Sequence, residues 1–284
     1  MSNTQQSHAA IAEKTKRRQP STRPIGVFDS GVGGLSVLRE LVKLLPQENF
    51  VYLADQKNVP YGSKSAETIT QLSHQITHYL ITQHHCKLIV VACNTATAAA
   101  LNFLRQTHPN FPFVGMEPAV KPGAHATRSG KVGVLATSGT FASQRYTDLM
   151  ERYASEVQLF EDSCEGLVEL IEDGKLNDPE TAALLRSVLN PMIAEGVDTL
   201  VLGCTHYPFV TPLIRRIVGD DVTIIDPAPA VARQTARRLA EMTGQFGLIA
   251  GRPSGRVKFI STGDPNRFLQ QVDYLLPPAT PEAI

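Results

Sequence analysis

Two stretches with one layout indicate the fold of this 284-residue chain: Leu88-Ile-Val-Val-Ala-Cys-Asn-Thr-Ala96 and Leu200-Val-Leu-Gly-Cys-Thr-His-Tyr-Pro208. In each, an aliphatic run is followed by a small residue, a cysteine and, within two positions, a threonine. Aliphatic runs with little alternation are typical of strands buried on both faces of a parallel sheet. The repeat therefore predicts two similar α/β halves, each with a cysteine at the carboxyl end of a strand.

Further apolar runs flank these two and alternate with helical patterns. The predicted strands are residues 25–28, 50–54, 88–92, 113–116, 132–136, 157–160, 199–202, 222–225 and 257–260. The predicted helices include residues 36–45, 66–84, 140–154, 182–194 and 228–242. Strands that alternate with helices indicate parallel sheets with right-handed crossovers. The sequence thus predicts an α/β fold in which two domains with mostly parallel central sheets face each other across a cleft.

The two cysteines of the repeat are candidates for one shared site. Ligands of open α/β sheets bind beyond the carboxyl ends of the strands, so facing halves would bring Cys93 and Cys204 to two sides of one cleft. A pair of buried structural cysteines is the alternative, because free cysteine is among the most buried residue types. Hydroxyl and amide residues follow both cysteines, which favours a functional site.

The composition excludes several classes of protein. Hydrophobic residues make up 42% of the chain and charged residues 19%, which is too apolar for a disordered protein. Lys plus Arg and Asp plus Glu number 27 each, so the net charge does not point to nucleic acid or an anionic membrane as a partner. No apolar run approaches the roughly 20 residues that span a bilayer.

The first 23 residues differ from the rest of the chain. They are polar, carry basic residues between Lys14 and Arg18, and lack the apolar core of a secretory signal peptide. We expect a flexible, solvated extension there. Four cysteines are too few for a disulfide scaffold, and without an export signal they should stay reduced. These features predict a soluble, cytoplasmic protein.

A glycine-rich segment, Gly26-Val-Phe-Asp-Ser-Gly-Val-Gly-Gly-Leu-Ser36, links the first predicted strand to a helix. Glycines let the backbone approach a ligand, and the N–H groups of a helix start can hold an anion. The spacing is not G-x-G-x-x-G, and Asp29 ahead of the glycines would repel a pyrophosphate. A turn that binds a carboxylate, with an acid that meets an ammonium group, fits better. A tight strand–helix turn without a ligand is the alternative.

A second motif pairs an acid with a rigid turn. Asp55 follows the second predicted strand, and Pro60-Tyr61-Gly62-Ser63 presents an aromatic ring with a polar tip. Ordinary loops show this pattern too, so the motif alone indicates little.

The third motif, Cys204-Thr-His-Tyr-Pro208, places a histidine two residues from a cysteine. An imidazolium close to a cysteine favours the thiolate. A zinc site of Cys93, Cys204 and His206 is the competing interpretation, although structural zinc sites favour close pairs such as C-x₂-C. His84-His85-Cys86 is expected to be the last turn of a helix and not a ligand cluster, because adjacent helical residues point in different directions.

Two opposed thiols suit a specific chemistry. Exchange of the hydrogen at a stereocentre without a cofactor needs a base on one face and an acid on the other. The two groups exchange roles with the direction of reaction, so they should be chemically alike. A thiolate and a thiol can fill both roles if neighbouring groups adjust them.

Four segments, in order, resemble the signature motifs of glutamate racemases: Phe28-Asp-Ser-Gly-Val-Gly-Gly-Leu-Ser36, Pro60-Tyr-Gly62, Ala92-Cys-Asn-Thr-Ala96 and Gly203-Cys-Thr-His-Tyr-Pro208. The resemblance extends from about Ile25 to the end of the chain. It implies a cofactor-independent, metal-free interconversion of L- and D-glutamate, with the D-isomer used for peptidoglycan and hence for the cell wall and cell shape.

The resemblance also implies roles for individual residues. Cys93 would act on the Cα hydrogen of D-glutamate, with Asp29 and Asp55 beside it. Cys204 would act on that of L-glutamate, supported by His206 and Glu172; Glu165 and Glu169 lie in the same helical stretch and are alternatives to Glu172. The substrate would be bound by Asp29, Ser30, Tyr61, Gly62, Asn94, Thr95, Thr205 and His206.

A domain layout follows from the same resemblance. Residues 24–117 and 228–284 would form the domain of Cys93, residues 118–227 the domain of Cys204, and residues 1–23 the extension. The family includes monomers and more than one dimer arrangement, so a homodimer is left open. Similar extensions occur in Gram-negative members activated by UDP-N-acetylmuramoyl-alanine, and the extension alone motivates the hypothesis that this nucleotide is an activator here.

Three other functions compete with this one. An aspartate or hydantoin racemase would use the same two thiols on another substrate. A non-catalytic amino-acid-binding protein would use the cleft but needs no paired thiols. A redox sensor that closes a Cys93–Cys204 disulfide requires Cα atoms within about 7 Å, which leaves no room for a substrate between them.

Overall fold

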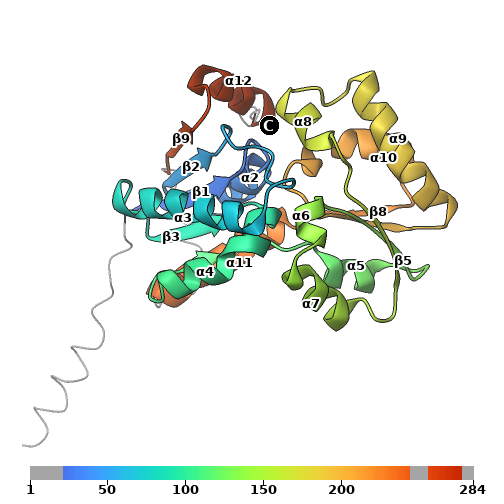
Figure 1. Cartoon of the computed structure of the whole chain (residues 1–284), viewed down its shortest axis with the longest axis horizontal. Coiled ribbons are helices and arrows are strands. Elements are labelled where there is room, and N and C mark those ends of the chain that lie inside the picture. The colour runs from blue at the N-terminus through green and yellow to red at the C-terminus, as the bar shows by residue number, and fades with distance from the viewer. Residues whose placement is uncertain (1–21, 244–254, 277–284) are drawn as a thin grey trace, which may run out of the picture.

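The computed structural model describes residues 22–243 and 255–276, and these contain two parallel sheets (Figure 1). The first sheet has the strand order β4 (Phe113–Val114), β3 (Leu88–Val91), β1 (Ile25–Asp29), β2 (Phe50–Ala54) and β9 (Val257–Ser261). The second has the order β6 (Gln158–Asp162), β5 (Lys131–Leu135), β7 (Thr199–Leu202) and β8 (Thr223–Ile225). Every pairing between these strands is parallel.

The nine strands are those that the apolar runs predict, with ends that differ by at most two residues. The strands β1, β2, β3 and β7 are buried at every position, as expected where helices cover both faces of a parallel sheet. The predicted α/β fold with two sheets is confirmed.

Two pairs of helices cover the first sheet. On one face, α3 (Ala66–Thr82) packs against α4 (Asn94–Thr107); on the other, α2 (Leu35–Leu44) packs against α11 (Ala228–Thr243). The last described helix, α12 (Pro265–Leu275), buries Phe268 and Val272 in the same core as α2.

The other described helices surround the second sheet (Figure 1). They are α5 (Val120–Ala126), α6 (Ser138–Phe141), α7 (Gln144–Tyr153), α8 (Leu167–Glu172), α9 (Pro179–Ala194), α10 (Thr211–Val218) and a 3₁₀ turn, η1 (Tyr207–Val210). Within the described residues, no helix is both long enough and apolar enough to span a membrane.

Two helix predictions are wrong in detail. The predicted helix over residues 140–154 is two helices, because the Ser143 side chain accepts a hydrogen bond from Tyr146 N and starts α7 anew. The predicted helix over residues 66–84 ends at Thr82. His85 has a φ of 51°, a left-handed conformation that cannot continue a helix, so His84-His85-Cys86 is a turn after the helix and not its last turn.

Little of the predicted amino-terminal extension belongs to the described residues. Residues 1–21, including the basic patch between Lys14 and Arg18, lie outside the described residues. Arg23, the last residue of the predicted extension, is described and contacts the first half of the chain. Its guanidinium donates to the carbonyl oxygens of His85 at 2.6 Å and Cys86 at 3.0 Å.

One hydrophobic core connects the two sheets. It contains Val32 and Tyr52 from the first half together with Leu135, Cys204 and Tyr207 from the second. The carboxyl ends of β1 and β3 and that of β7 therefore meet at the junction, where the candidate site lies.

Candidate active site

A cavity at this junction is lined by both cysteines of the repeat. Cys93 follows β3, Cys204 follows β7, and each is nearly buried. The residues that line the cavity are Ser30, Pro60, Tyr61, Gly62, Cys93, Asn94, Thr95, Thr137, Val168, Cys204, Thr205 and His206. The structure therefore brings together most of the residues singled out in the sequence.

Cys93 caps the amino end of α4. Its Sγ accepts a hydrogen bond from Ala96 N at 3.4 Å. Burial raises the pKa of the Cys93 thiol well above its ordinary value, and the nearby carboxylate of Asp29 raises it further. Cys93 is thus held as a thiol, the form that can donate a proton.

Asp29 ends β1 and is fully buried beside Cys93. Its Oδ2 accepts hydrogen bonds from Gly34 N at 2.6 Å and from Thr205 Oγ1 at 3.3 Å, so it joins the two halves of the molecule. Burial raises the pKa of Asp29, against the opposing effects of His206, Cys93 and the Gly34 N–H. A carboxylate with a raised pKa is a better proton acceptor.

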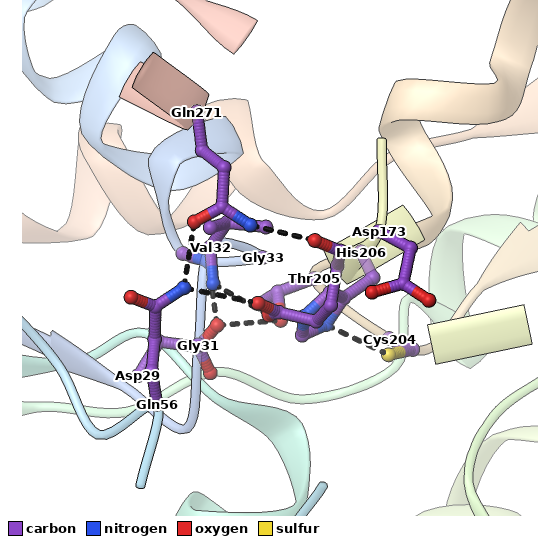
Figure 2. A network of polar contacts seen from close by, with 12 residues as sticks. Asp29, Gly31, Val32, Gly33, Gln56, Asp173, Cys204, Thr205, His206 and Gln271 are labelled. Carbon is purple, nitrogen blue, oxygen red and sulfur yellow. Dashed lines mark hydrogen bonds and ion pairs between the residues drawn. The ribbon is translucent and has the colours of Figure 1, made fainter. Parts of the chain in front are cut away.

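A chain of three side chains lies on the Cys204 face (Figure 2). Cys204 Sγ lies 3.8 Å from Nδ1 of His206, and Nε2 of the same ring lies 2.7 Å from Oε1 of Glu172. All three residues are buried. This is the arrangement of a thiol, a base and a carboxylate that orients the base.

The charges in this chain stabilise one another. Burial favours a neutral imidazole, but the hydrogen bonds and charges of Cys204 and Glu172 outweigh it and raise the pKa of His206 well above its ordinary value. Burial likewise opposes ionisation of Glu172, yet hydrogen bonds from His206, Val32 N–H and Gln56 lower its pKa. The structure therefore favours an imidazolium between Cys204 and a Glu172 carboxylate.

Among the three glutamates of this stretch, only Glu172 reaches His206. Glu165 and Glu169 are exposed, whereas Glu172 is 6% exposed at the end of α8. Glu172 Oε1 also accepts a hydrogen bond from Val32 N at 2.7 Å, which crosses from one half of the chain to the other.

The glycine-rich turn after β1 binds carboxylates of the protein itself. The N–H groups of Val32 and Gly34 donate to Glu172 and Asp29. A Cβ on Gly31 would lie 1.9 Å from Glu172 Oε1, and one on Gly33 would lie 2.4 Å from His206 Nδ1. The glycines are therefore required by the close approach of Glu172 and His206. The expectation that the amides of this turn bind a ligand anion is wrong for those of Val32 and Gly34, because both already donate to carboxylates of the protein.

Asp55 lies behind the cavity and does not line it. Its Oδ2 accepts a 2.6 Å hydrogen bond from the Tyr61 hydroxyl, and Oδ1 accepts one from Thr262 Oγ1 at 2.7 Å. Burial and Asp55 raise the pKa of Tyr61 well above its ordinary value. Asp55 thus fixes Tyr61, which does line the cavity, as a neutral phenol.

Asn94 and Thr95 start α4 at the cavity wall. Asn94 is 3% exposed, and neither atom of its amide has a hydrogen-bond partner among the described residues. Since a buried amide without a partner is costly, Asn94 is suited to binding a polar ligand. Thr95 Oγ1 lies 2.8 Å from Thr137 Oγ1, which follows β5 in the other half.

Sequence reasoning missed Thr137, although a signal for it exists. Thr137 begins the hydroxyl-rich run Thr137-Ser-Gly-Thr140 directly after a predicted strand, as the cysteines do. It also missed Val168, which comes from a short helix without such a motif, and Pro60, known only as a turn residue.

A larger cavity of about 340 Å³ lies on the other side of Glu172. It is lined by Gln56, Val59, Pro60, Val168, Glu169, Glu172, Asp173, Gly263, Asp264 and Arg267. Within residues 22–243 and 255–276, no group of three or more His, Cys, Asp or Glu side chains is arranged to hold a metal ion.

Comparisons with known proteins agree with this geometry. The sequence profile described as Asp/Glu/Hydantoin racemase matches residues 25–235. The glutamate racemase of Ectopseudomonas mendocina is 52% identical over 257 residues, which cover 90% of this chain and 94% of that protein.

Solved structures are similar over nearly the whole chain. A glutamate racemase isoform from Bacillus anthracis has a TM-score of 0.78 and 33% identity, covering 89% of this chain and 93% of that one. The Escherichia coli glutamate racemase, solved with L-glutamate and the activator UDP-MurNAc-Ala, has a TM-score of 0.76 and 33% identity, covering 89% and 95%.

Proposed function

The chain belongs to the Asp/Glu/hydantoin racemase family, and we propose that it is a glutamate racemase whose two acid–base groups are Cys93 and Cys204. The observation that carries the proposal is that these two cysteines, from the ends of strands in different sheets, line one cavity. The 52% identity to a glutamate racemase over 90% of this chain favours glutamate over aspartate as the substrate.

The reaction from L- to D-glutamate begins on the Cys204 face. The Cys204 thiolate, stabilised by the His206 cation, removes the Cα proton, and the electron pair of the C–H bond stays on the substrate as a carbanion. Cys93, held as a thiol, donates its proton to the opposite face. The products are D-glutamate, a Cys204 thiol and a Cys93 thiolate, so no electrons are gained or lost.

The reverse reaction needs Cys93 as the thiolate. Asp29 lies beside Cys93, and its raised pKa suits it to take the thiol proton. When D-glutamate binds the resting state, in which Cys204 is the thiolate and Cys93 the thiol, Asp29 accepts the Cys93 proton, and His206, with Glu172 behind it, gives a proton to Cys204. Each face thus has one cysteine and one neighbouring group that exchanges a proton with it, Asp29 for Cys93 and His206 for Cys204.

The polar lining is suited to binding the substrate. The unpartnered amide of Asn94 and the hydroxyls of Ser30 and Thr95 offer donors for the two carboxylates, whereas the Thr205 hydroxyl already donates to Asp29. Asp29 offers a negative charge for the ammonium group. General acid–base groups supply about 10²–10⁴-fold each, so the preorganised polar groups of the cavity must supply most of the remaining acceleration through stabilisation of the carbanion.

The test is hydrogen exchange in D₂O. Purified protein without added cofactor should remove the Cα proton signal of L-glutamate, and D-glutamate should appear on a chiral column. L-aspartate, run in parallel, should exchange far more slowly. Cys93→Ser and Cys204→Ser should each abolish racemisation, whereas Cys86→Ser, a buried cysteine outside the cavity, should retain it. Folded wild-type protein that exchanges neither amino acid, both without and with UDP-N-acetylmuramoyl-alanine, would refute the proposal.

Regulation by the nucleotide UDP-N-acetylmuramoyl-alanine is the finer part of the proposal. It is supported by the activator bound to the similar Escherichia coli enzyme. A candidate site for its diphosphate is a cluster of arginines on three helices: Arg105 on α4, Arg145 on α7, which pairs with Glu117, and Arg238 on α11, which pairs with Glu241. Burial and the like charges of Arg145 and Arg238 lower the pKa of Arg105. The activator should raise kcat/KM of this protein, and an unchanged kcat/KM would remove the idea.

The biological role proposed for the product is peptidoglycan synthesis in the cytoplasm. Its support is the resemblance to the family. Depletion of the protein in its native cell should cause a growth defect that added D-glutamate relieves.

A further inference from the structure

A second layer of polar side chains, Gln56 and Gln271, supports Glu172, and Figure 2 labels both of these amides. Gln56 follows β2 and Gln271 lies on α12, so both belong to the half of the chain opposite Glu172. Gln56 Nε2 donates to Glu172 Oε2 at 3.2 Å and to Gln271 Oε1 at 2.7 Å. Gln271 Nε2 donates to the backbone carbonyl of Glu172 at 2.6 Å. Hydrogen bonds from the two glutamines therefore hold both the carboxylate and the backbone carbonyl of Glu172.

The partners of these amides define their orientation. Gln56 Oε1 accepts a hydrogen bond from Ser261 Oγ at 2.8 Å, which leaves Nε2 to face Glu172 and Gln271. Rotating the Gln56 amide by half a turn would set its oxygen against the Glu172 carboxylate, and rotating that of Gln271 would set oxygen against a carbonyl. Both contacts are repulsive. The network therefore has one satisfied arrangement.

The helix that carries Gln271 is itself anchored to the site. Phe268 on α12 stacks on Tyr52, with ring centroids 6.1 Å apart and planes at 17°. The Tyr52 hydroxyl donates to the carbonyl oxygen of Gly31 at 2.8 Å, in the turn that contacts Glu172. Gln271 is thus a fixed support and not a mobile surface side chain.

The consequence concerns one face of the reaction. Glu172 contacts His206, and His206 contacts Cys204, whereas among the described residues no hydrogen bond joins a member of this network to Cys93. We propose that Gln56 and Gln271 are positioning residues for the Cys204 face, which hold Glu172 against His206 and so set the rate of proton transfer at Cys204. This inference rests on the proposed racemase function.

The variants that test it are Gln271→Leu and Gln56→Leu, with Gln270→Leu as the matched control. Gln270 is the neighbouring residue on α12 and is exposed. Each test variant should lower kcat/KM by about tenfold or more, because small misplacements of catalytic groups are costly. The control should stay within about twofold of the wild type. Thermal unfolding, measured in parallel, shows which variants remain folded at the assay temperature.

Rates alone do not identify the face, because the two enantiomers have equal free energy and kcat/KM must fall equally in both directions. Glutamate deuterated at Cα does identify it. In L-glutamate the deuteron is removed by Cys204, so the isotope effect on kcat/KM should rise as that transfer becomes slower than reprotonation. In D-glutamate the deuteron is removed by Cys93. Because that removal is then fast compared with the transfer at Cys204, the isotope effect on kcat/KM should fall.

The outcomes separate this inference from the proposed function. If the wild type racemises glutamate but both folded variants keep its rates, the inference is wrong. It is equally wrong if they lose activity with unchanged isotope effects, because the loss would then be structural. Should Gln271→Leu be unfolded at the assay temperature, Gln56→Leu, which is changed in a loop and not in α12, decides by the same criteria. A wild type without racemase activity refutes the proposed function instead.

Discussion

Among single residues, Glu172 has a role that pH dependence can test directly. Burial lowers the pKa of His206, whereas Cys204 and the Glu172 carboxylate raise it, and Glu172→Gln removes that carboxylate charge. Asp29 is the other charged group that interacts with the His206 imidazole. The His206 cation supports the Cys204 thiolate, so activity requires a pH below the pKa of His206. Lowering that pKa should move the alkaline limit of kcat/KM to lower pH, and kcat/KM at its optimum should fall about 10²-fold.

The matched controls are Glu165→Gln and Glu169→Gln, which remove the same charge from exposed positions. Initial rates across the neutral and alkaline range should give them the wild-type profile. An alkaline limit that Glu172→Gln leaves in place would show that Glu172 does not act through His206.

The glycines of the turn after β1 give a second prediction at this scale. Gly33→Ala would place a Cβ 2.4 Å from His206 Nδ1 and 2.5 Å from Thr205 Oγ1, and should reduce kcat/KM by about 10²-fold by moving the ring. Gly130 has open space around its Cα but a φ of +74°, which is strained for a residue with a Cβ. Gly130→Ala should therefore lower the free energy of unfolding by roughly 1–2 kcal/mol and leave activity unchanged. Urea unfolding and rate assays on both variants check this. Equal activity of the two would contradict it.

The residues predicted from the sequence and those missed differ in a physical way. Cys93 and Cys204 each follow an apolar strand within a motif, and strand ends converge by topology, so their meeting was predictable. The resemblance singled out Glu172, but the residue pattern alone left Glu165 and Glu169 as alternatives, because the choice depends on where the short helix α8 begins. Gln56 and Gln271 carry no motif, and their contacts follow only from how α12 docks on the other half.

Among the elements, strands were predicted more reliably than helix ends. Buried strands are short apolar runs between polar turns, and these are visible in the sequence. The break between α6 and α7 lies within a continuous helical pattern. It arises because the Ser143 hydroxyl competes for the Tyr146 N–H, which is a local hydrogen bond that periodicity does not report.

The cap on α7 yields a stability prediction. Ser143→Ala removes the acceptor for Tyr146 N and should lower the free energy of unfolding by about 1 kcal/mol. Ser138→Ala, at an exposed position in α6 without a cap bond, should change it by less than about 0.5 kcal/mol. Urea denaturation measures both, and equal effects would mean that the hydroxyl bond does not start α7.

For the whole molecule, we propose the division predicted from the resemblance: residues 24–117 with 228–284, and residues 118–227. Its support is in the contacts. After β8 the chain returns to the first half through α11, which packs against α2 and contacts β4, whereas α5 contacts β5, β7 and β8. Proteolysis that cuts first near residue 117 or 228 would agree with this division.

The two proposed domains should nevertheless unfold together. One of their hydrophobic clusters crosses the junction, and so do buried hydrogen bonds, including Ser36 Oγ to the Thr205 carbonyl at 2.9 Å and Val32 N to Glu172 Oε1 at 2.7 Å. Neither half could expose that cluster at little cost. Calorimetry should therefore show one transition whose calorimetric and van't Hoff enthalpies agree. Two resolved transitions would mean that the halves are stable alone, and that the acid–base groups of the two faces are brought together by the substrate and not by the fold.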